Sequence, residues 1–456
     1  MTRATVVGGG LAGCEAAWAL AERGVPVTLR EMRPAVRTAA HQSDRLAELV
    51  CSNSFKSTDL TNAHGLLKAE LRRLGSILLE AADAAAVPAG AALAVDREVF
   101  SRLVHDRVTA HPLITVERGE VTELPSPGVV ATGPLTSERL AAAIVRRLRP
   151  VTPQGKSDDP ASEPAAALAF YDAIAPIVSR ESLDESRVYA LSRYGKGGGD
   201  DYLNCPMSRE EYDGFIAALA AADQFTAHEF DQVPYFEGCL PVEEMARRGP
   251  ETLRFGPMKP VGLPDPRTGR EPWAVVQLRR EDRAGQMWNL VGFQTRLRIP
   301  EQQRVFRSIP GLAGAEFFRF GSIHRNTYLN SPAWLGPALT APGDDTLFFA
   351  GQLTGVEGYT ESLGTGLLAG INLARRLGGS VVSVPPPTTM LGALYRYLRE
   401  ADPAHFQPMN ANFGLLDPLD GQAVGRSGGR RGKDLRKGLL VERAQQDFEE
   451  WVTTLA

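Results

Sequence analysis

The chain has 456 residues, of which 43% are hydrophobic and 23% charged, and its formal net charge is −4. This length allows two or three domains with a large buried core, and the composition excludes an intrinsically disordered chain. The slightly acidic total gives no general sign of nucleic-acid binding, although local basic patches can still attract RNA.

Cysteine usage and the absence of targeting segments favour a cytoplasmic protein. The four cysteines include no Cys-x-x-Cys pair and therefore predict free thiols in a reducing compartment. The sequence shows no signal peptide and no apolar stretch long enough to cross a membrane. The seven histidines have no metal-ligand spacing, so we expect no metal site.

The N-terminal residues predict a dinucleotide-binding unit that consists of a strand, a glycine turn, a helix and a second strand ending in an acid. Gly8 permits the tight turn, Gly10 lets the backbone approach a pyrophosphate, and Gly13 lets the helix pack closely on the strand. The helix over Leu11–Arg23 offers free N–H groups to the phosphates, and Glu31 is placed to bind a ribose hydroxyl. An ordinary glycine turn is the less favoured alternative, because strand, helix and acid all accompany the motif. The residues predicted to bind the cofactor here are Gly8, Gly9, Gly10, Leu11, Ala12, Gly13 and Glu31.

Helices and strands then alternate up to a loop over residues 150–164, which is rich in Pro, Ser, Asp and Gly and predicts a domain boundary. The expected elements before this loop are helical structure over 66–86, a helix over 96–109 capped by Asp96, a strand pair over 115–123, a buried strand over 129–133, and a helix over 138–148 capped by Thr136 or Ser137.

The stretch from 165 to 319 has a different pattern, in which short strands alternate with loops around one clear helix over 209–221. This pattern predicts a mixed domain inserted into the first one. The pattern of the first domain returns after it, and the C-terminal part is helical. The elements expected in these regions are strands over 275–278, 289–293 and 346–352 and helices over 362–377, 390–400 and 439–453.

We therefore expect an α/β fold, with a Rossmann-like FAD-binding domain of the two-dinucleotide flavoprotein type and an inserted mixed α+β domain. FAD is favoured over NAD because three predicted parallel strands each end in glycine. Ala131-Thr132-Gly133 resembles the second motif of these flavoproteins, and Ala350-Gly351-Gln352 resembles the late motif that brings a helix N-terminus to the flavin. The expected segments are 1–90, 129–150 and 320–380 for the FAD-binding domain, 91–128 for a helix and strands bordering it, 151–319 for the inserted domain, and 381–456 for a C-terminal helical region with a basic segment.

Eight motifs resemble the folate- and FAD-dependent tRNA uracil-5-methyltransferase family, and the likeness runs from residue 1 to about 416. The loop over 150–164 is expanded relative to that family, and the basic tail does not align with it. The motifs occupy residues 48–54 (ELVCSNS), 62–65 (NAHG), 202–207 (YLNCPM), 236–241 (FEGCLP), 255–263 (FGPMKPVGL), 324–327 (HRNT), 350–359 (AGQLTGVEGY) and 407–414 (QPMNANFG).

The resemblance implies a chemistry. In that family the target is the T-loop uridine at tRNA position 54, the one-carbon donor is methylenetetrahydrofolate, and FAD reduced by NADH or NADPH supplies hydride. Uracil C5 is a poor nucleophile, and addition of a thiolate at C6 converts it into an enolate-like carbon. The resemblance implies Cys239 as this nucleophile and Cys51 as the base that removes the C5 proton. Candidates for activating these thiols are Lys56, Arg45 and Lys259.

Three further residues have both a functional and an ordinary structural interpretation. His324 is expected to stack on the folate pterin, or else is a surface histidine. Lys259 is expected to bind substrate, or else caps a turn. Tyr359 is expected to contact the flavin, or else packs in the core. We interpret the two remaining cysteines, Cys14 and Cys205, as structural.

The expected partners are tRNA, a folate and a nicotinamide cofactor, with no membrane and no obligate protein partner. RNA contacts are expected at the basic run Arg426–Lys437, which has six Lys or Arg and one Asp, and at Arg146, Arg147 and Arg149. The basic run is otherwise a solvated loop. The alternative function is FAD-dependent modification of the wobble uridine by a member of the glucose-inhibited-division family. A flavin-linked dithiol oxidoreductase would need two cysteines close in sequence, and an RNA-binding scaffold would carry no flavin.

Overall fold

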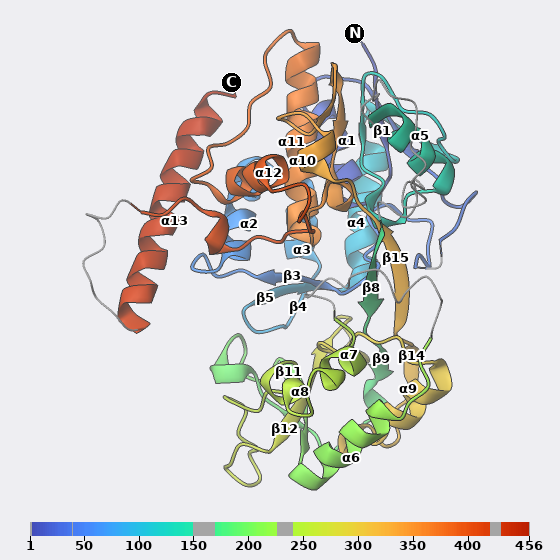
Figure 1. Ribbon diagram of the computed structural model, residues 1–456, viewed down its shortest axis with the longest axis vertical. Coiled ribbons are helices and arrows are strands. Elements are labelled where there is room, and N and C mark those ends of the chain that lie inside the picture. The colour runs from blue at the N-terminus through green and yellow to red at the C-terminus, as the bar shows by residue number, and fades with distance from the viewer. Residues whose placement is uncertain (1, 39, 149–168, 226–239, 420–429, 456) are drawn as a thin grey trace.

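The computed structural model describes residues 2–38, 40–148, 169–225, 240–419 and 430–455. Figure 1 shows an upper lobe that contains both the first strands and the last helices, and a lower lobe built from the middle of the chain. The antiparallel ribbon of β8 (Ala169–Ile174) and β15 (Ser322–Thr327) connects them. The chain thus leaves the upper lobe and returns to it, and the predicted α/β class with an inserted domain is confirmed.

The upper lobe is built on a six-stranded sheet with the strand order β16-β17-β7-β1-β2-β6. Neighbouring strands pair in parallel, except that β16 is antiparallel to β17. The carboxyl ends of the parallel strands therefore share one edge of the sheet, which is where ligands bind in such folds. The strands are β1 (Ala4–Val7), β2 (Val27–Glu31), β6 (Ile114–Arg118), β7 (Gly128–Val130), β16 (Thr340–Ala341) and β17 (Asp344–Phe349).

Helices surround this sheet, and a small sheet lies below them. The predicted helices over 96–109 and 138–148 are confirmed, and the Asp96 side chain caps the first of them. The helices are α1 (Leu11–Ala21), α2 (Ala63–Arg73), α3 (Ile77–Ala84), α4 (Arg97–Ala110), α5 (Glu138–Leu148), α10 (Ser331–Trp334), α11 (Tyr359–Leu377), α12 (Met390–Glu400) and α13 (Arg430–Thr453). The small sheet consists of β3 (Ser54–Ser57), β4 (Ala86–Val87) and β5 (Ala92–Val95).

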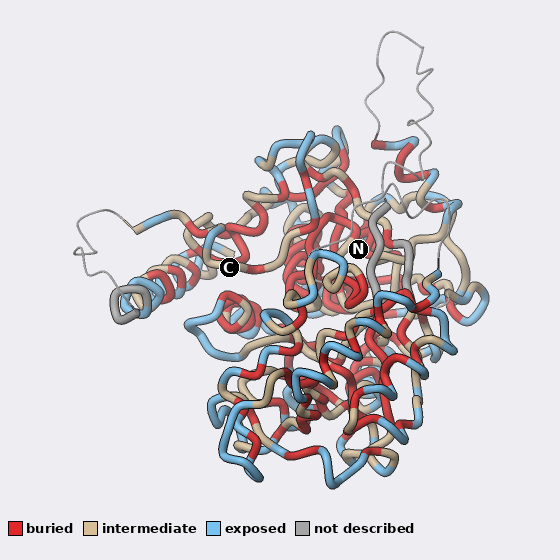
Figure 2. Tube along the Cα trace, turned by 60° about the horizontal axis from the view of Figure 1, so that its bottom comes forward, coloured by how far each residue is buried: buried red, intermediate tan, exposed pale blue. Residues whose placement is uncertain are grey.

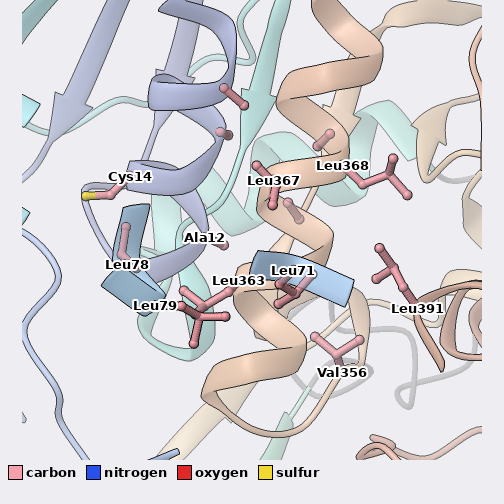
Figure 3. Close-up of a cluster of buried hydrophobic side chains, with 14 of the residues drawn as sticks. Ala12, Cys14, Leu71, Leu78, Leu79, Val356, Leu363, Leu367, Leu368 and Leu391 are labelled. Atoms are coloured by element: carbon pink, nitrogen blue, oxygen red, sulfur yellow. The ribbon is translucent and has the colours of Figure 1, made fainter. Parts of the chain in front are cut away.

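Helix α11 packs directly against α1. Gly366 and Gly370 permit this contact, because a Cβ at Gly366 would lie 2.2 Å from the carbonyl oxygen of Ala12. A Cβ at Gly370 would lie 2.5 Å from that of Ala16. Each fully buried leucine side chain stabilises the folded state by about 1.5–3 kcal/mol relative to an exposed one. Figure 3 shows leucines that continue this core, namely Leu71, Leu363, Leu367, Leu368 and Leu391.

Three local predictions are wrong. Residues 66–86 form two helices, because Gly75 adopts a φ of +81° after α2 and Ser76 caps α3. Only the single strand β6 forms within residues 115–123. The basic run, interpreted as a loop, is helical from Arg430 onward. Its first residues, 426–429, lie outside the described ranges.

The lower lobe has its own antiparallel sheet, with the order β10-β11-β12-β13-β9-β14, and a separate hydrophobic core. Figure 2 shows buried residues in the interior of both lobes. The strands are β9 (Ile177–Ser179), β10 (Tyr189–Ala190), β11 (Tyr202–Met207), β12 (Ala274–Arg280), β13 (Met287–Leu290) and β14 (Phe317–Arg319). The helices are α6 (Arg209–Ala220), α7 (Val242–Arg247), α8 (Thr252–Phe255) and α9 (Ile299–Phe306). Within the described ranges, no helix combines the length and apolar character needed to span a bilayer.

Candidate active site at the carboxyl edge of the sheet

The turn between β1 and α1 has the geometry of a phosphate cradle. Gly8 has a φ of +105°, and a Cβ on it would lie 2.5 Å from the carbonyl oxygen of Ala131. A Cβ on Gly13 would lie 1.8 Å from the Gly8 carbonyl oxygen. A Cβ on Gly10 would meet no atom within 4 Å. Gly10 is also the N-cap of α1 and offers no side-chain cap, so the first N–H groups of the helix are free to bind an anion.

Three adjoining cavities run along this edge of the sheet. The first lies beside the cradle and Glu31, and the second lies between the cradle and the late glycine motif. The third includes Cys51. Leu135 lines all three, so they form one elongated site that fits an extended dinucleotide.

Glu31 closes the first cavity and is 5% exposed. Its Oε2 accepts a hydrogen bond from the Gly9 N–H at 2.9 Å, and its Oε1 accepts from the Arg33 backbone N–H and Nε. Although burial opposes ionisation, these bonds and the Arg33 charge hold the pKa of Glu31 below its usual value. The acid is therefore ionised at neutral pH and able to accept a ribose hydroxyl.

Arg33 is a site residue that sequence reasoning missed. Its guanidinium, 2% exposed, also binds Glu48 Oε2 at 3.1 Å and the carbonyl oxygen of Ser43 at 3.1 Å. Arg33 therefore links the acid at the end of β2 to the segment that leads to Cys51. Its position two residues after Glu31 was the available signal, but a lone arginine after a strand predicts no particular partner.

The late motif lies beside the cradle. Gly351 and Gln352 line the second cavity together with Gly10 and Tyr359. Gly351 adopts a φ of +75°, which favours glycine, and its N–H donates to Thr365 Oγ1 at 2.8 Å. The structure thus brings together the two glycine motifs that lie furthest apart in the sequence.

Cys51 lies in the wall of the third cavity, with Gln352 and Tyr359. Its N–H donates to the Tyr359 hydroxyl at 3.0 Å, and this hydroxyl donates to the Ser52 carbonyl oxygen at 2.8 Å. Burial, as the largest cause, raises the pKa of Tyr359 well above its usual range. The hydroxyl therefore stays protonated and fixes the backbone on both sides of the thiol.

The other predicted residues lie elsewhere or outside the described ranges. Cys239 is outside them, and His324 is described only by its backbone, which pairs with Asp172 across β15 and β8. Lys259 is exposed in a turn of the lower lobe and lines none of the three cavities.

The two cysteines interpreted as structural, Cys14 and Cys205, are fully buried. Burial raises the pKa of Cys205 to about 12, and it raises that of Cys14 as well. A thiol that stays protonated at neutral pH is a poor nucleophile, which agrees with a structural role for both.

Comparison with known proteins gives a consistent result. The sequence profile of the family described as Glucose inhibited division protein A matches residues 3–380. The methylenetetrahydrofolate–tRNA-(uracil-5-)-methyltransferase TrmFO of Geobacter sulfurreducens is 57% identical over 453 residues, which cover 99% of both chains. The enzyme of the same name from Symbiobacterium thermophilum is 55% identical, over 98% of this chain and 96% of its own.

A solved structure of Aquifex aeolicus GidA matches 98% of this chain and 73% of its own with a TM-score of 0.66. Its sequence identity of 15% supports a shared fold alone. The identities above 50% over nearly the whole length are much more specific. The chain therefore belongs to the methylenetetrahydrofolate–tRNA-(uracil-5-)-methyltransferase family, within the wider family of glucose inhibited division protein A.

Proposed function

We propose that this protein methylates C5 of a tRNA uracil, with methylenetetrahydrofolate as one-carbon donor and FAD as redox cofactor. The observation that carries this proposal is the position of Cys51, whose cavity adjoins the cradle between the first and last glycine motifs. Relatives that are 51–57% identical over nearly the whole chain are named for this same reaction, which supports the proposal.

The residues of the elongated site fit FAD. The uncapped N-terminus of α1 and the open space at Gly10 suit the pyrophosphate, and ionised Glu31 suits the adenosine ribose. Gly351, Gln352 and Tyr359 then hold the flavin end. When bound there, the reduced cofactor supplies the hydride that converts a methylene group into a methyl group.

The protein's own contribution is covalent and acid–base chemistry. Cys239 adds as a thiolate to C6 of the uracil, which makes C5 nucleophilic toward the one-carbon unit. Cys51 then removes the C5 proton as tetrahydrofolate leaves the one-carbon unit, and the Cys239 thiolate is released from C6 once hydride has added. We further assign His324 to stacking on the folate pterin and Lys259 to substrate binding, on the strength of the family resemblance.

The target is the T-loop uridine at position 54, and NADH or NADPH is the reductant. Reaching a base inside a folded T-loop requires that it be turned out of its stack. With tRNA as substrate and free thiols as catalysts, we place the enzyme in the cytoplasm, without an obligate protein partner. Wobble-uridine modification is less favoured, because the solved GidA structure is only 15% identical in sequence, whereas a relative that is 57% identical over 99% of this chain has the methyltransferase name.

The direct test is mass spectrometry of tRNA nucleosides after incubation with FAD, NADPH and isotopically labelled methylenetetrahydrofolate. We expect label in 5-methyluridine. A parallel reaction with labelled S-adenosylmethionine serves as the control. Label transferred only from S-adenosylmethionine would overturn the proposed donor.

A further inference from the structure

Side chains from distant parts of the chain bind the backbone carbonyls around Cys51. Arg97, at the start of α4, donates from Nη1 to the carbonyl oxygen of Leu49 at 2.7 Å and from Nη2 to that of Cys51 at 2.8 Å. Arg319, at the end of β14, donates from Nη2 to the carbonyl oxygen of Val50 at 3.0 Å. Two guanidiniums therefore hold three consecutive carbonyls and fix the direction of this segment.

Arg97 is itself held by the lower lobe. Its Nε lies 2.6 Å from Oε2 of Glu281, the residue that follows β12, and the Glu281 side chain is 1% exposed. Although burial opposes its charge, Glu281 raises the pKa of Arg97. In such a buried pair, removal of one partner leaves the other charge uncompensated. Because Arg97 belongs to the upper lobe and Glu281 to the lower lobe, the pair is maintained only while the two lobes are in contact.

Asn53 forms a second connection between the Cys51 segment and the end of β12. Its side chain is fully buried and donates from Nδ2 to the carbonyl oxygens of Val95 and Arg280, both at 2.9 Å. Its Oδ1 accepts from Arg279 Nε at 2.9 Å. The segment is thus tied to the lower lobe on both sides of the thiol.

We propose that Arg97 is a positioning residue for the Cys51 base, and that Glu281 sets its position. Docking of the lower lobe then places the thiol for proton abstraction. This inference rests on the proposed role of Cys51. Proton transfer requires the base within hydrogen-bond reach of the proton, and a displacement of about 1 Å can cost about a hundredfold in rate.

The experiment uses the purified, FAD-loaded enzyme with the double variant Arg97→Met/Glu281→Gln. The single change Arg97→Met would leave the buried Glu281 charge unpaired, and the second substitution removes that charge. Arg97→Lys keeps the positive charge but cannot span two carbonyls and a carboxylate at once. Arg107→Met is the matched control, because Arg107 lies on the same helix in an exposed ion pair with Glu80 at 2.8 Å.

Three quantities are measured: amide hydrogen exchange in residues 49–53 without substrate, the alkylation rate of Cys51 at one pH, and the kinetics of tRNA methylation. In the double variant we expect near-normal FAD content, exchange at least about tenfold faster, and an altered alkylation rate. We expect kcat to fall about 10- to 100-fold with little change in KM for tRNA. Arg97→Lys should restore part of kcat, and Arg107→Met should behave as the wild type.

Unchanged exchange in the double variant would overturn the proposal, whether or not methylation falls. Loss of FAD and of folded structure even in Arg97→Lys would also overturn it, since Arg97 would then be a general stabiliser. Failure of the proposed role of Cys51 is recognised separately, by Cys51→Ala retaining methylation. Hydrogen exchange is measured without substrate, so it reports whether Arg97 holds the segment even if Cys51 is not the base.

Discussion

At the scale of single residues, a substitution of Gly10 is expected to weaken cofactor binding without disturbing folding. A Cβ there would meet no protein atom within 4 Å, and Gly10 lines the cavity that we assign to the pyrophosphate. We expect Gly10→Val to fold normally and to bind FAD at least about tenfold more weakly, a loss of about 1.4 kcal/mol. Flavin absorbance per mole of protein and far-UV circular dichroism check the two expectations.

Gly214→Val is the control for this change, because Gly214 is an exposed glycine of α6 with no atom near its Cβ position. It should keep full flavin content. Gly13→Val should instead disturb folding, because its Cβ would lie 1.8 Å from a carbonyl oxygen. Full yellow colour in folded Gly10→Val would contradict the cradle assignment.

The two proposed catalytic thiols differ in the step at which they act. With tRNA containing 5-fluorouridine at the target position, the C5 substituent cannot leave as a proton, so the adduct at C6 should accumulate. Cys239→Ala should abolish both adduct and methylation. Cys51→Ala should abolish methylation but retain the adduct, which denaturing gel electrophoresis detects. Loss of the adduct in Cys51→Ala alone would exchange the two roles.

Sequence reasoning located residues whose roles depend on local order, and it missed those that depend on distant partners. Gly8, Gly10 and Glu31 belong to one continuous unit, and the pattern of that unit predicts their placement. Arg97 and Glu281 are 184 residues apart. Nothing in the residues around either one indicates that they meet.

At the scale of elements, α1 meets the start of α3 through a buried acid. Glu15 is fully buried and binds Ser76 and the Leu78 N–H through Oε1. Its Oε2 has no partner among the described residues. Burial raises the pKa of Glu15 from 4.5 to about 8, so the folded protein keeps this proton at pH values where the unfolded chain has lost it.

The sign of the pH dependence follows from this difference. The contribution of Glu15 to stability is fully present below about pH 4.5 and is lost progressively as pH rises to about 8. Over that interval the loss approaches about 1.4 kcal/mol per pH unit. Glu15→Gln removes the titration, so its melting temperature should fall less than that of the wild type between pH 5 and 8.

Glu442→Gln provides the comparison, since Glu442 is an exposed acid of the separate helix α13. It should show the same pH dependence of melting as the wild type. If the wild type and Glu15→Gln gave parallel curves, Glu15 would be ionised in the folded state.

The periodicity of hydrophobic residues predicted most elements well, because it depends on local burial. It failed where one residue decides the conformation. A left-handed Gly75 ends α2, and Ser76 starts α3, within a stretch whose apolar pattern is continuous. It also failed for the basic run, where charge and glycine suggested a loop although residues from Arg430 onward are helical.

At the scale of the whole molecule, the described residues of the two basic clusters predicted to contact RNA lie on opposite sides. Figure 1 shows α13 on the left and α5 on the right. We expect the α13 cluster to bind tRNA, because its helix displays Arg436 and Lys437 to solvent. Replacing both by Gln should weaken binding and reduce the slope of log affinity against log salt by about 2.

The same substitutions at Arg146 and Arg147 of α5 test the other side separately. Fluorescence anisotropy of labelled tRNA across a salt series measures both pairs. Unchanged affinity and slope in the α13 variant, with a loss in the α5 variant, would place the tRNA on the α5 side.

The six-stranded sheet of the upper lobe combines strands from distant parts of the chain, and this has a consequence for the order of events during synthesis. The neighbouring strands β7 and β17 are separated in the chain by the whole lower lobe. The cradle emerges from the ribosome early, but Gly351 and the helix that supports α1 emerge only after residue 350. A nascent chain therefore has half of its flavin site for most of translation, and we expect stable capture of the flavin to be a late step that follows completion of the inserted domain.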